Sequence, residues 1–343
     1  MAMTKPSVAG ATGTGPLFRV DNLRVDFRSH AQTVRAVRGV SFQVAAGETF
    51  AIVGESGSGK TVSMMAVMRL LQSPPAHVEA DALTFQGRDL RAVPPRDWWR
   101  VTGEQIAMVF QDALTALNPV YTVGWQIAEM FRVHRPKMTR REIRERSIEL
   151  LRKVGIPEPA RRLDDYPHQF SGGMRQRAMI AMAIALEPRL LIADEPTTAL
   201  DVTVQAQIMD LLRQLKDEHD MSLILITHDL GLVAETADRV AIMYAGSVVE
   251  TGTIREVLGH PGHPYTLGLL GSRPQATAKG EKLRPILGSP PNLAAMPQGC
   301  PFHPRCGQAM DICIGTPPPQ VRMPSGQSVT CHAVAPQPKG DMT

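Results

Sequence analysis

The feature that most constrains this chain is a glycine-rich segment at positions 54–61, which fits the pattern G-x-x-x-x-G-K-S/T in full. An apolar run at 49–53 precedes it and predicts a buried strand, and residues 62–71 follow as a predicted helix. In this setting the glycines let the backbone wrap a phosphate, with successive N–H groups pointing inward. We call this segment the phosphate loop, and we expect it to bind a nucleotide through Gly54, Glu55, Ser56, Gly57, Ser58, Gly59, Lys60 and Thr61. Lys60 should neutralise the β- and γ-phosphates, and the Thr61 hydroxyl should coordinate Mg²⁺.

A second apolar run, at 190–193, ends in two carboxylates, Asp194 and Glu195. Asp194 at the strand end can hold the Mg²⁺ shell, and Glu195, one residue on, can polarise an attacking water. Acids at strand ends are often only solvated. Because a complete phosphate loop lies upstream, the hydrolytic interpretation is favoured here.

Strands and helices alternate along most of the chain. Alternating apolar and polar residues at 18–27, strand-like segments within 34–44 and apolar runs at 223–226 and 240–244 predict strands, and the pattern from about 122 to 189 is helical. Such alternation predicts an α/β fold in which helices pack on the faces of a parallel sheet. No internal repeat is visible, so we expect one copy of the nucleotide-binding domain.

Composition limits the classes of protein that remain. A chain of 343 residues, 43% hydrophobic, can bury one substantial core and carry an appended module. Its longest apolar stretches are too short to cross a bilayer, and residues 1–16 predict a flexible tail instead of a leader. We therefore expect a cytosolic protein, or one attached to a membrane only through partners. A net charge of +4 with 5% aromatic residues does not call for a nucleic-acid partner.

A second predicted anion site lies at Ser171, Gly172 and Gly173, which open a predicted helix through residue 186. The segment Phe-Ser-Gly-Gly-Met at 170–174 resembles the signature sequence LSGGQ of the ABC ATPase family. We call residues 170–174 the signature segment. The resemblance implies a head-to-tail dimer, in which this segment of one subunit grips the γ-phosphate bound by the other.

The remaining motifs of that family follow in order. Gln111 resembles the glutamine that contacts Mg²⁺ or the attacking water and links the ATP site to membrane subunits, and His228 resembles the switch histidine that touches the γ-phosphate. The resemblance implies that both act in catalysis with Glu195. Asp201 ends a segment, 198–201, that is similar to the loop crossing the dimer interface, and Phe27 stands where the family stacks an aromatic ring on adenine. The resemblance covers 17–253. It implies a P-loop NTPase of ABC type, with a mixed-sheet core, an antiparallel β subdomain and a helical subdomain at about 112–189.

Several stretches resemble the dipeptide/oligopeptide/nickel importer branch, namely residues 111–119, 166–169, 263–266 and 300–306. We call residues 254–343 the C-terminal extension, since a minimal ATPase domain lacks it. The branch implies a second ATPase subunit, two permease subunits, an extracytoplasmic solute-binding protein and a place on the cytoplasmic face of the membrane. Which solute is carried, and whether the two ATPase subunits are identical, stay open.

Four cysteines, all in the C-terminal extension, form a separate group: Cys300, Cys306, Cys313 and Cys331. Cytosolic reductants oppose disulfides, and zinc sites usually carry tighter C-x-x-C pairs. Some relatives in the branch carry a 4Fe–4S cluster in this extension, and four thiolates can hold one. The resemblance therefore implies a cluster, with zinc or unligated thiols as alternatives.

Other functions are also found with, or compatible with, the same fold. Chromosome-maintenance ATPases insert a long coiled coil between phosphate loop and signature, and the segment 62–170 leaves no room for one. Translation-associated ATPases carry two such domains in one chain. A third alternative is an ATPase with a metal- or Fe–S-sensing role that is not coupled to transport.

Overall fold

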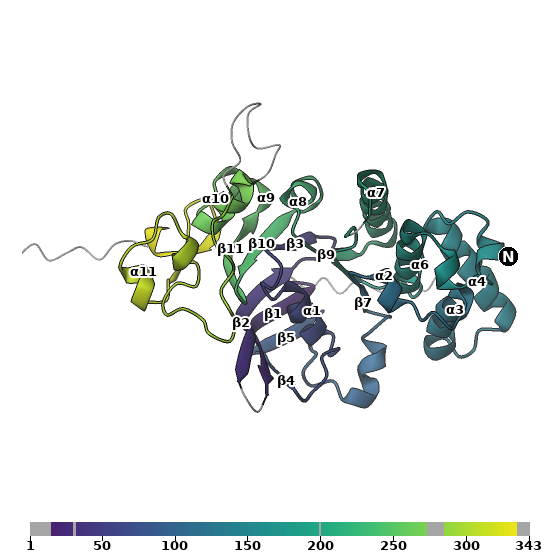
Figure 1. Ribbon diagram of the computed structural model, residues 1–343. Coiled ribbons are helices and arrows are strands. Elements are labelled where there is room, and N and C mark those ends of the chain that lie inside the picture. The colour runs from purple at the N-terminus through teal and green to yellow at the C-terminus, as the bar shows by residue number, and fades with distance from the viewer. Residues whose placement is uncertain (1–14, 30–31, 199, 273–284, 335–343) are drawn as a thin grey trace, which may run out of the picture.

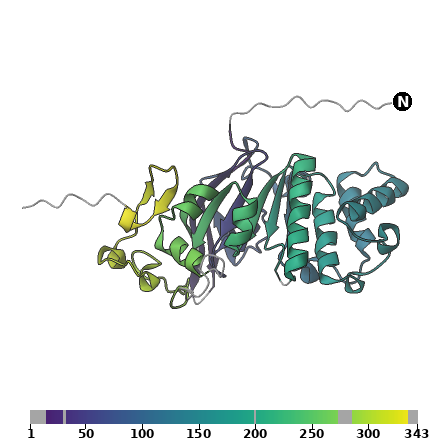
Figure 2. The same cartoon turned by 90° about the horizontal axis from the view of Figure 1, so that it is seen from above.

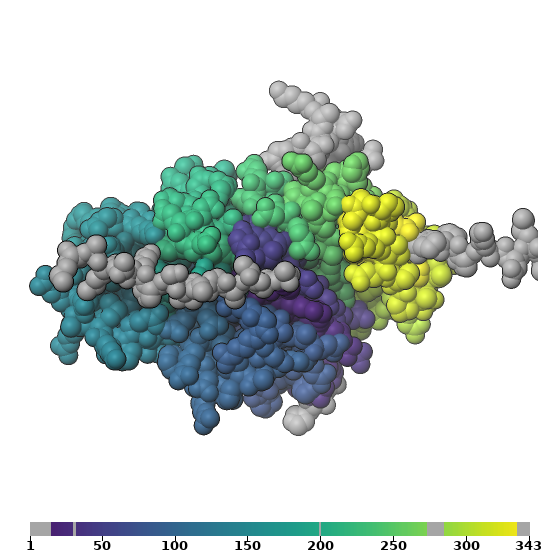
Figure 3. Space-filling view, turned by 180° about the vertical axis from the view of Figure 1, so that it is seen from behind, coloured from purple at the N-terminus to yellow at the C-terminus, as the bar shows by residue number. Residues whose placement is uncertain are grey.

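Two sheets and a group of helices form an elongated molecule in the computed structural model (Figure 1). The structure describes residues 15–29, 32–198, 200–272 and 285–334, so the predicted tail at 1–16 lies almost wholly outside the described residues. The helical part lies at one end and the C-terminal extension at the other, with the sheets between them (Figures 2 and 3).

The smaller sheet comes from the first ninety residues and is antiparallel. Its strands run in the order β2-β1-β5-β6, and β4 pairs with β1. The bounds are β1 Phe18–Arg28, β2 Thr33–Val44, β4 Ala76–Glu79, β5 Ala82–Phe85 and β6 Arg88–Asp89. Along β1, buried and exposed side chains alternate in part, as a sheet with one covered face requires. The predicted antiparallel β subdomain is confirmed.

The larger sheet has eight strands in the order β12-β13-β11-β10-β3-β9-β8-β7. The bounds are β3 Thr49–Val53, β7 Ile106–Val109, β8 Leu190–Asp194, β9 Ser222–Thr227, β10 Arg239–Tyr244, β11 Ser247–Thr253, β12 Gln320–Arg322 and β13 Ser328–Thr330. Strands β10, β3, β9, β8 and β7 are parallel, whereas β11, β13 and β12 join antiparallel. The mixed sheet predicted from the family resemblance is confirmed.

Helices surround the larger sheet and form the helical part. The α-helices are α1 Lys60–Val67, α2 Ala113–Ala116, α3 Val123–His134, α4 Arg140–Lys153, α5 Pro159–Arg162, α6 Gly172–Ile184, α7 Val202–His219, α8 Leu230–Thr236, α9 Ile254–Gly259, α10 Pro264–Gly271 and α11 Ile312–Gly315. Short 3₁₀ turns lie at Pro95–Arg100, Pro167–Gln169, His303–Arg305 and His332–Val334. Helix α1 starts two residues before the predicted 62–71 and ends earlier. None of the helices described here is long and apolar enough to cross a membrane.

Two hydrophobic cores lie on the two faces of the larger sheet. Alternate residues of one strand point to opposite faces, so Ala51 and Val53 enter one core while Phe50 and Ile52 enter the other. The first core packs helices α3, α4, α6 and α7 on the sheet, and the second packs the smaller sheet and α1. The central strands are buried on both faces, which explains their continuous apolar runs.

The C-terminal extension is part of the larger sheet. Its strand β13 pairs with β11 through Glu250↔Val329 and Thr251↔Ser328, and β12 pairs with β13. Val329 is fully buried, and Cys300, Phe302 and Cys313 belong to the first core. The sequence alone predicts residues 254–343 as an appended module. Because three-residue strands leave almost no alternating pattern, the pairing could not be read from the sequence.

Aromatic side chains join the extension to the end of β10. The rings of Tyr244, Tyr265 and Phe302 meet with centroids 4.7 to 5.4 Å apart, and the His263 ring lies 5.7 Å from that of Phe302. His263 caps α10, because its Nδ1 accepts the N–H of Tyr265 at 3.0 Å. Burial lowers the pKa of the His263 imidazole from 6.5 to about 4.

Replacing His263 should therefore change how acid affects stability. In the unfolded chain the imidazole takes up a proton near its ordinary pKa, whereas the folded chain resists it down to about pH 4. Stability from this group is thus present above about pH 6.5 and is lost as pH falls toward 4, by about 3 kcal/mol in total. The variant His263→Asn keeps a capping acceptor that does not titrate. Urea unfolding of both proteins across this range should show the wild type losing more free energy.

Parallel curves for the two proteins would contradict this prediction. The neighbouring Glu250 carboxyl, which accepts the N–H groups of Gly262 and His263, also has a pKa altered by burial, raised in its case. Its contribution is common to both proteins and cancels in the difference.

Candidate functional site

The phosphate loop joins the end of β3 to the start of α1. Gly54 has no room for a side chain, because a Cβ atom there would lie 2.2 Å from the Met243 carbonyl oxygen. Gly57 and Gly59 have φ values of 78° and 98°, in the left-handed region that glycine adopts at little cost. A Cβ at Gly59 would also lie 2.6 Å from the Ala36 carbonyl oxygen. The glycines are therefore required by crowding and by backbone conformation.

Lys60 is buried, and its Nζ donates to the Gly54 and Glu55 carbonyl oxygens at 2.8 and 2.9 Å. Burial lowers the pKa of the Lys60 ammonium, and the charges of Glu195, Asp194 and Glu55 oppose that shift. Ser58 Oγ is buried and has no hydrogen-bond partner among the described residues. A cation held only by carbonyls and an unsatisfied hydroxyl suit a loop that receives an anion.

Asp194 is the last residue of β8, is only 1% exposed, and accepts the Thr61 hydroxyl at 3.0 Å. Burial raises the pKa of the Asp194 carboxyl to about 6, with the neighbouring Glu195 adding to the shift. Mg²⁺ prefers oxygen ligands and would favour the ionised carboxylate. The hydroxyl and carboxylate brought together here fit such an ion by chemistry, as the sequence analysis predicted for these two residues.

Glu195 is the point where three strand ends meet. Its Oε2 accepts Gln111 Nε2 at 2.9 Å and the Thr198 hydroxyl at 2.8 Å, and its Oε1 lies 3.5 Å from His228 Nδ1. Gln111 follows β7, Glu195 follows β8 and His228 follows β9, which are neighbours in the sheet. The φ of Glu195 is 43°, an uncommon conformation for a residue with a side chain. The structure thus brings together the three residues predicted to act in hydrolysis.

The signature segment lies at the start of α6. Ser171 is its N-cap, and its Oγ accepts the N–H of Met174 at 3.3 Å. Asp201 caps α7 in the same way, through the N–H of Val204 at 2.9 Å. No hydrogen bond or ion pair in the described part of the chain joins either residue to the phosphate loop.

Phe27 lies in β1, opposite Val34 and Ala76 on the neighbouring strands. Its side chain is half-buried and packs against the second core. Its predicted place beneath adenine stays a prediction.

The four cysteines gather in the extension. The N–H of Cys300 donates to the Cys313 carbonyl oxygen at 2.8 Å, and Cys300, Cys313 and Cys331 are buried. Burial raises the pKa of the Cys300, Cys306 and Cys331 thiols, and the nearby sulfurs raise each of these further. The donor set has the number and kind of ligands that a cluster takes. Within the described residues, however, no three Cys, His, Asp or Glu side chains are already arranged to ligate a metal ion.

Sequence reasoning missed three contributors to this site. Thr198 bonds the Glu195 carboxylate from three residues away, which a local Glu-x-x-Thr pattern would have flagged. Arg305 and Tyr265 contact Glu55 from positions more than 200 residues away, and a single sequence carries no sign of such contacts.

Comparison with protein families gives two matches. Residues 37–198 match the family described as ABC transporter, and residues 249–313 match the oligopeptide/dipeptide transporter C-terminal region. The dipeptide transport ATP-binding protein DppD of Bacillus subtilis is 50% identical over 312 residues, which cover 91% of this chain and 93% of that protein. DppD of Escherichia coli strain K12 is 49% identical over 92% of this chain and 96% of its own length. The oligopeptide transport ATP-binding protein OppD of Bacillus subtilis is 49% identical over 90% and 86%.

Solved structures resemble the nucleotide-binding part of the chain. A bacterial ABC transporter cassette determined as a dimer superposes with a TM-score of 0.62 at 26% identity, covering 69% of this chain and 99% of that one. A dimeric cassette bound to ADP and Pi after hydrolysis gives 0.61 at 25% identity, with the same coverage.

The variant Glu195→Gln should slow hydrolysis without a comparable loss of ATP binding. Glutamine keeps an acceptor for Thr198 but removes the carboxylate that would orient or activate water, so turnover should fall by about 10²- to 10⁴-fold. The ATP dissociation constant, measured by equilibrium binding with Mg²⁺, should change by less than about threefold, far below a tenfold step of 1.4 kcal/mol.

Glu235→Gln is the matched control, because it removes the same charge from the exposed face of α8. Its turnover should equal that of the wild type. Full activity of Glu195→Gln, or equal losses in both variants, would remove Glu195 from the chemistry.

Proposed function

This chain belongs to the ABC transporter family, in the branch with the oligopeptide/dipeptide transporter C-terminal region, and on this premise we propose that it is the ATP-hydrolysing subunit of a peptide importer. The observation that carries the proposal is 50% identity, over nearly the whole of both chains, to a protein named for dipeptide transport. That likeness favours transport over a sensing ATPase that is not coupled to it.

The proposed chemistry uses the residues that meet at the strand ends. The phosphate loop and Lys60 would hold the β- and γ-phosphates, and Thr61 and Asp194, with Gln111, would hold Mg²⁺. Glu195 orients water for in-line attack, with Gln111 and His228 fixing its carboxylate on either side. When bound, the metal neutralises the charge that develops on the γ-phosphate.

The second half of each ATP site comes from another subunit in this proposal. Ser171, Gly172 and Gly173 open α6 with free N–H groups and a hydroxyl, and Asp201 lies at the start of α7 beside them. The related cassettes were determined as dimers. We propose a head-to-tail pair in which the partner is a different ATPase chain.

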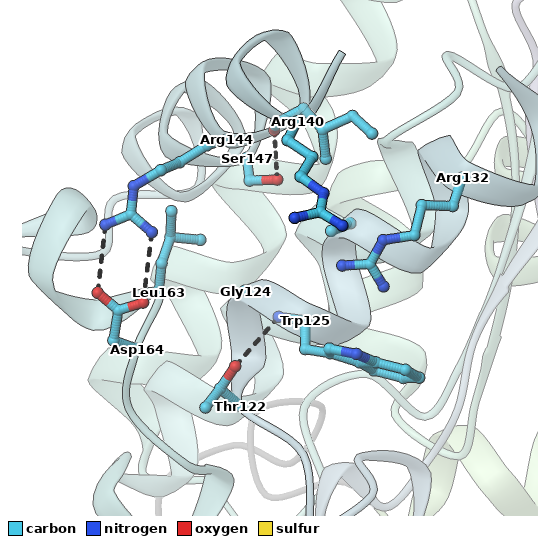
Figure 4. A pocket seen from close by; sticks show the side chains of 11 residues that line it. Thr122, Gly124, Trp125, Arg132, Arg140, Arg144, Ser147, Leu163 and Asp164 are labelled. Carbon is cyan, nitrogen blue, oxygen red and sulfur yellow. Dashed lines mark hydrogen bonds and ion pairs between the residues drawn. The ribbon is translucent and has the colours of Figure 1, made fainter. Parts of the chain in front are cut away.

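An exposed surface on the helical part suits attachment to permease subunits. Leu114 and Val120 are 61% and 70% exposed, and the Tyr121 ring stacks on that of Trp125 at 4.0 Å. Figure 4 shows the adjoining pocket, in which Arg132 and Arg140 project above Trp125. Across the pocket Arg144 pairs with Asp164 at 3.2 Å. Apolar residues beside the guanidinium groups of Arg132 and Arg140 fit a short partner helix with an acidic end, which would place this chain peripherally on the cytoplasmic face of the membrane.

Co-expression with the neighbouring genes tests the function. The chain should co-purify with multi-span permeases and a second ATPase, and vesicles carrying the complex should take up a labelled dipeptide when supplied with ATP and the external binding protein. Uptake should be lost with Glu195→Gln and kept with Glu235→Gln. Hydrolysis at the same rate with and without membrane partners would contradict a role in transport. Uptake of nickel but not of the dipeptide would identify nickel as the cargo instead.

We further propose that Cys300, Cys306, Cys313 and Cys331 hold a 4Fe–4S cluster. The gathering of four thiols in the C-terminal extension supports it. When bound, the cluster would cross-link this part of the extension.

Iron and sulfide analysis of anaerobically purified protein tests the cluster. We expect four of each per chain, with the visible absorption of a cluster, and a loss of both in Cys313→Ala. His303→Asn, which keeps all four thiols, is the control. One zinc per chain, or no metal, would overturn the proposal.

A further inference from the structure

The C-terminal extension contacts the phosphate loop through one ion pair. Arg305 ends a 3₁₀ turn between Cys300 and Cys306, and its guanidinium reaches the carboxylate of Glu55, the second residue of the loop. Nη1 donates to Oε2 at 2.6 Å and Nη2 donates to Oε1 at 2.9 Å. This two-pronged geometry is the strongest that an arginine and a carboxylate form. The Arg305 side chain is 5% exposed and that of Glu55 is 27% exposed, so solvent screens the pair only in part.

The backbone of Glu55 is held from the same side. Its N–H donates to the Tyr265 hydroxyl at 2.9 Å, and Tyr265 is fully buried at the start of α10. Arg305 Nη1 also reaches the Tyr244 hydroxyl at 3.4 Å, and its Nε donates to the Leu287 carbonyl oxygen at 3.1 Å. Both the side chain and the main chain of Glu55 are thus fixed by residues outside the nucleotide-binding motifs.

The carboxylate of Glu55 lies where negative charge is unfavourable. Lys60 Nζ donates to the main-chain carbonyl oxygen of Glu55 at 2.9 Å, and the charge of the Glu55 carboxylate acts on the Lys60 ammonium, the cation that the phosphates need. An unpaired carboxylate this near the phosphate loop would repel a bound polyphosphate, and the repulsion is strong in a partly buried site. The Arg305 guanidinium cancels that charge.

We propose that Arg305 is a positioning residue for ATP, by which the C-terminal extension neutralises Glu55 and fixes the start of the phosphate loop. The proposal rests on ATP binding at this loop, and it is independent of the cargo and of any metal at the cysteines. The extension therefore sets the affinity of the cassette for nucleotide.

Measured affinities of single and double variants test this. In the full chain, Arg305→Met keeps the aliphatic stem but leaves Glu55 unpaired, so ATP should bind about tenfold more weakly. The loss should be smaller for ADP, which carries less negative charge. Adding Glu55→Gln to Arg305→Met removes the exposed charge and should return the ATP dissociation constant to within about twofold of that of Glu55→Gln alone, since the two effects are coupled.

The double variant separates charge from structure. If Arg305 only anchored the extension, Glu55→Gln would not rescue ATP binding, and the affinities for ATP and ADP would fall alike. Either result would overturn the proposal. An unchanged ATP affinity in Arg305→Met would overturn it as well. Thermal unfolding of each variant shows whether it is folded.

Arg305→Lys provides a milder substitution that retains the charge, with ATP affinity expected between those of Arg305→Met and the wild type. Arg322→Ala, an exposed arginine on β12, is the matched control and should bind ATP as the wild type does. Failure of peptide uptake alone would leave these binding results unaffected.

Discussion

The structure depends on one geometric fact: the carboxyl ends of adjacent parallel strands lie at the same edge of a sheet. The phosphate loop follows β3, Glu195 follows β8, His228 follows β9 and Gln111 follows β7, and all of these strands are neighbours. The two cores that cover the sheet fix the positions of the strands. The site residues follow these strands closely, so no long loop is needed to place them. Elements far apart in sequence therefore converge on one site.

In the candidate site the charges of the side chains are only partly matched. Asp194 is buried with a raised pKa, Lys60 is buried with a lowered one, and Ser58 Oγ has no partner among the residues described. A polyphosphate would supply negative charge for Lys60 and an acceptor for the Ser58 hydroxyl, and a divalent ion would favour the ionised form of Asp194. The features that favour binding of an anion and a divalent ion are thus ones that cost stability in the folded chain.

Features set by neighbouring residues could be predicted from the sequence, whereas contacts between residues far apart in the sequence could not. The apolar runs that form β3, β8, β9 and β10 are confirmed within a residue at most ends, because strands buried on both faces need continuous apolar residues. The place of Gln111 in the site followed only from family resemblance, and its hydrogen bond to Glu195 was not predicted. Strands β12 and β13 are three residues long, and Arg305 lies 250 positions from Glu55, so neither leaves a periodic signal. The signature and adenine contacts involve molecules outside the chain and stay predictions.

The way the larger sheet ends bears on self-association. Without β13, the outer edge of β11 would offer seven residues of unpaired backbone to any other extended chain. Strand β13 covers part of that edge, and the sheet stops at β12, a three-residue strand that carries an exposed arginine. Short, charged edges are poor templates for further strand addition. The extension therefore disfavours polymerisation of the chain along this edge of the larger sheet. It leaves the face of the chain that carries the candidate site available for ordered assembly.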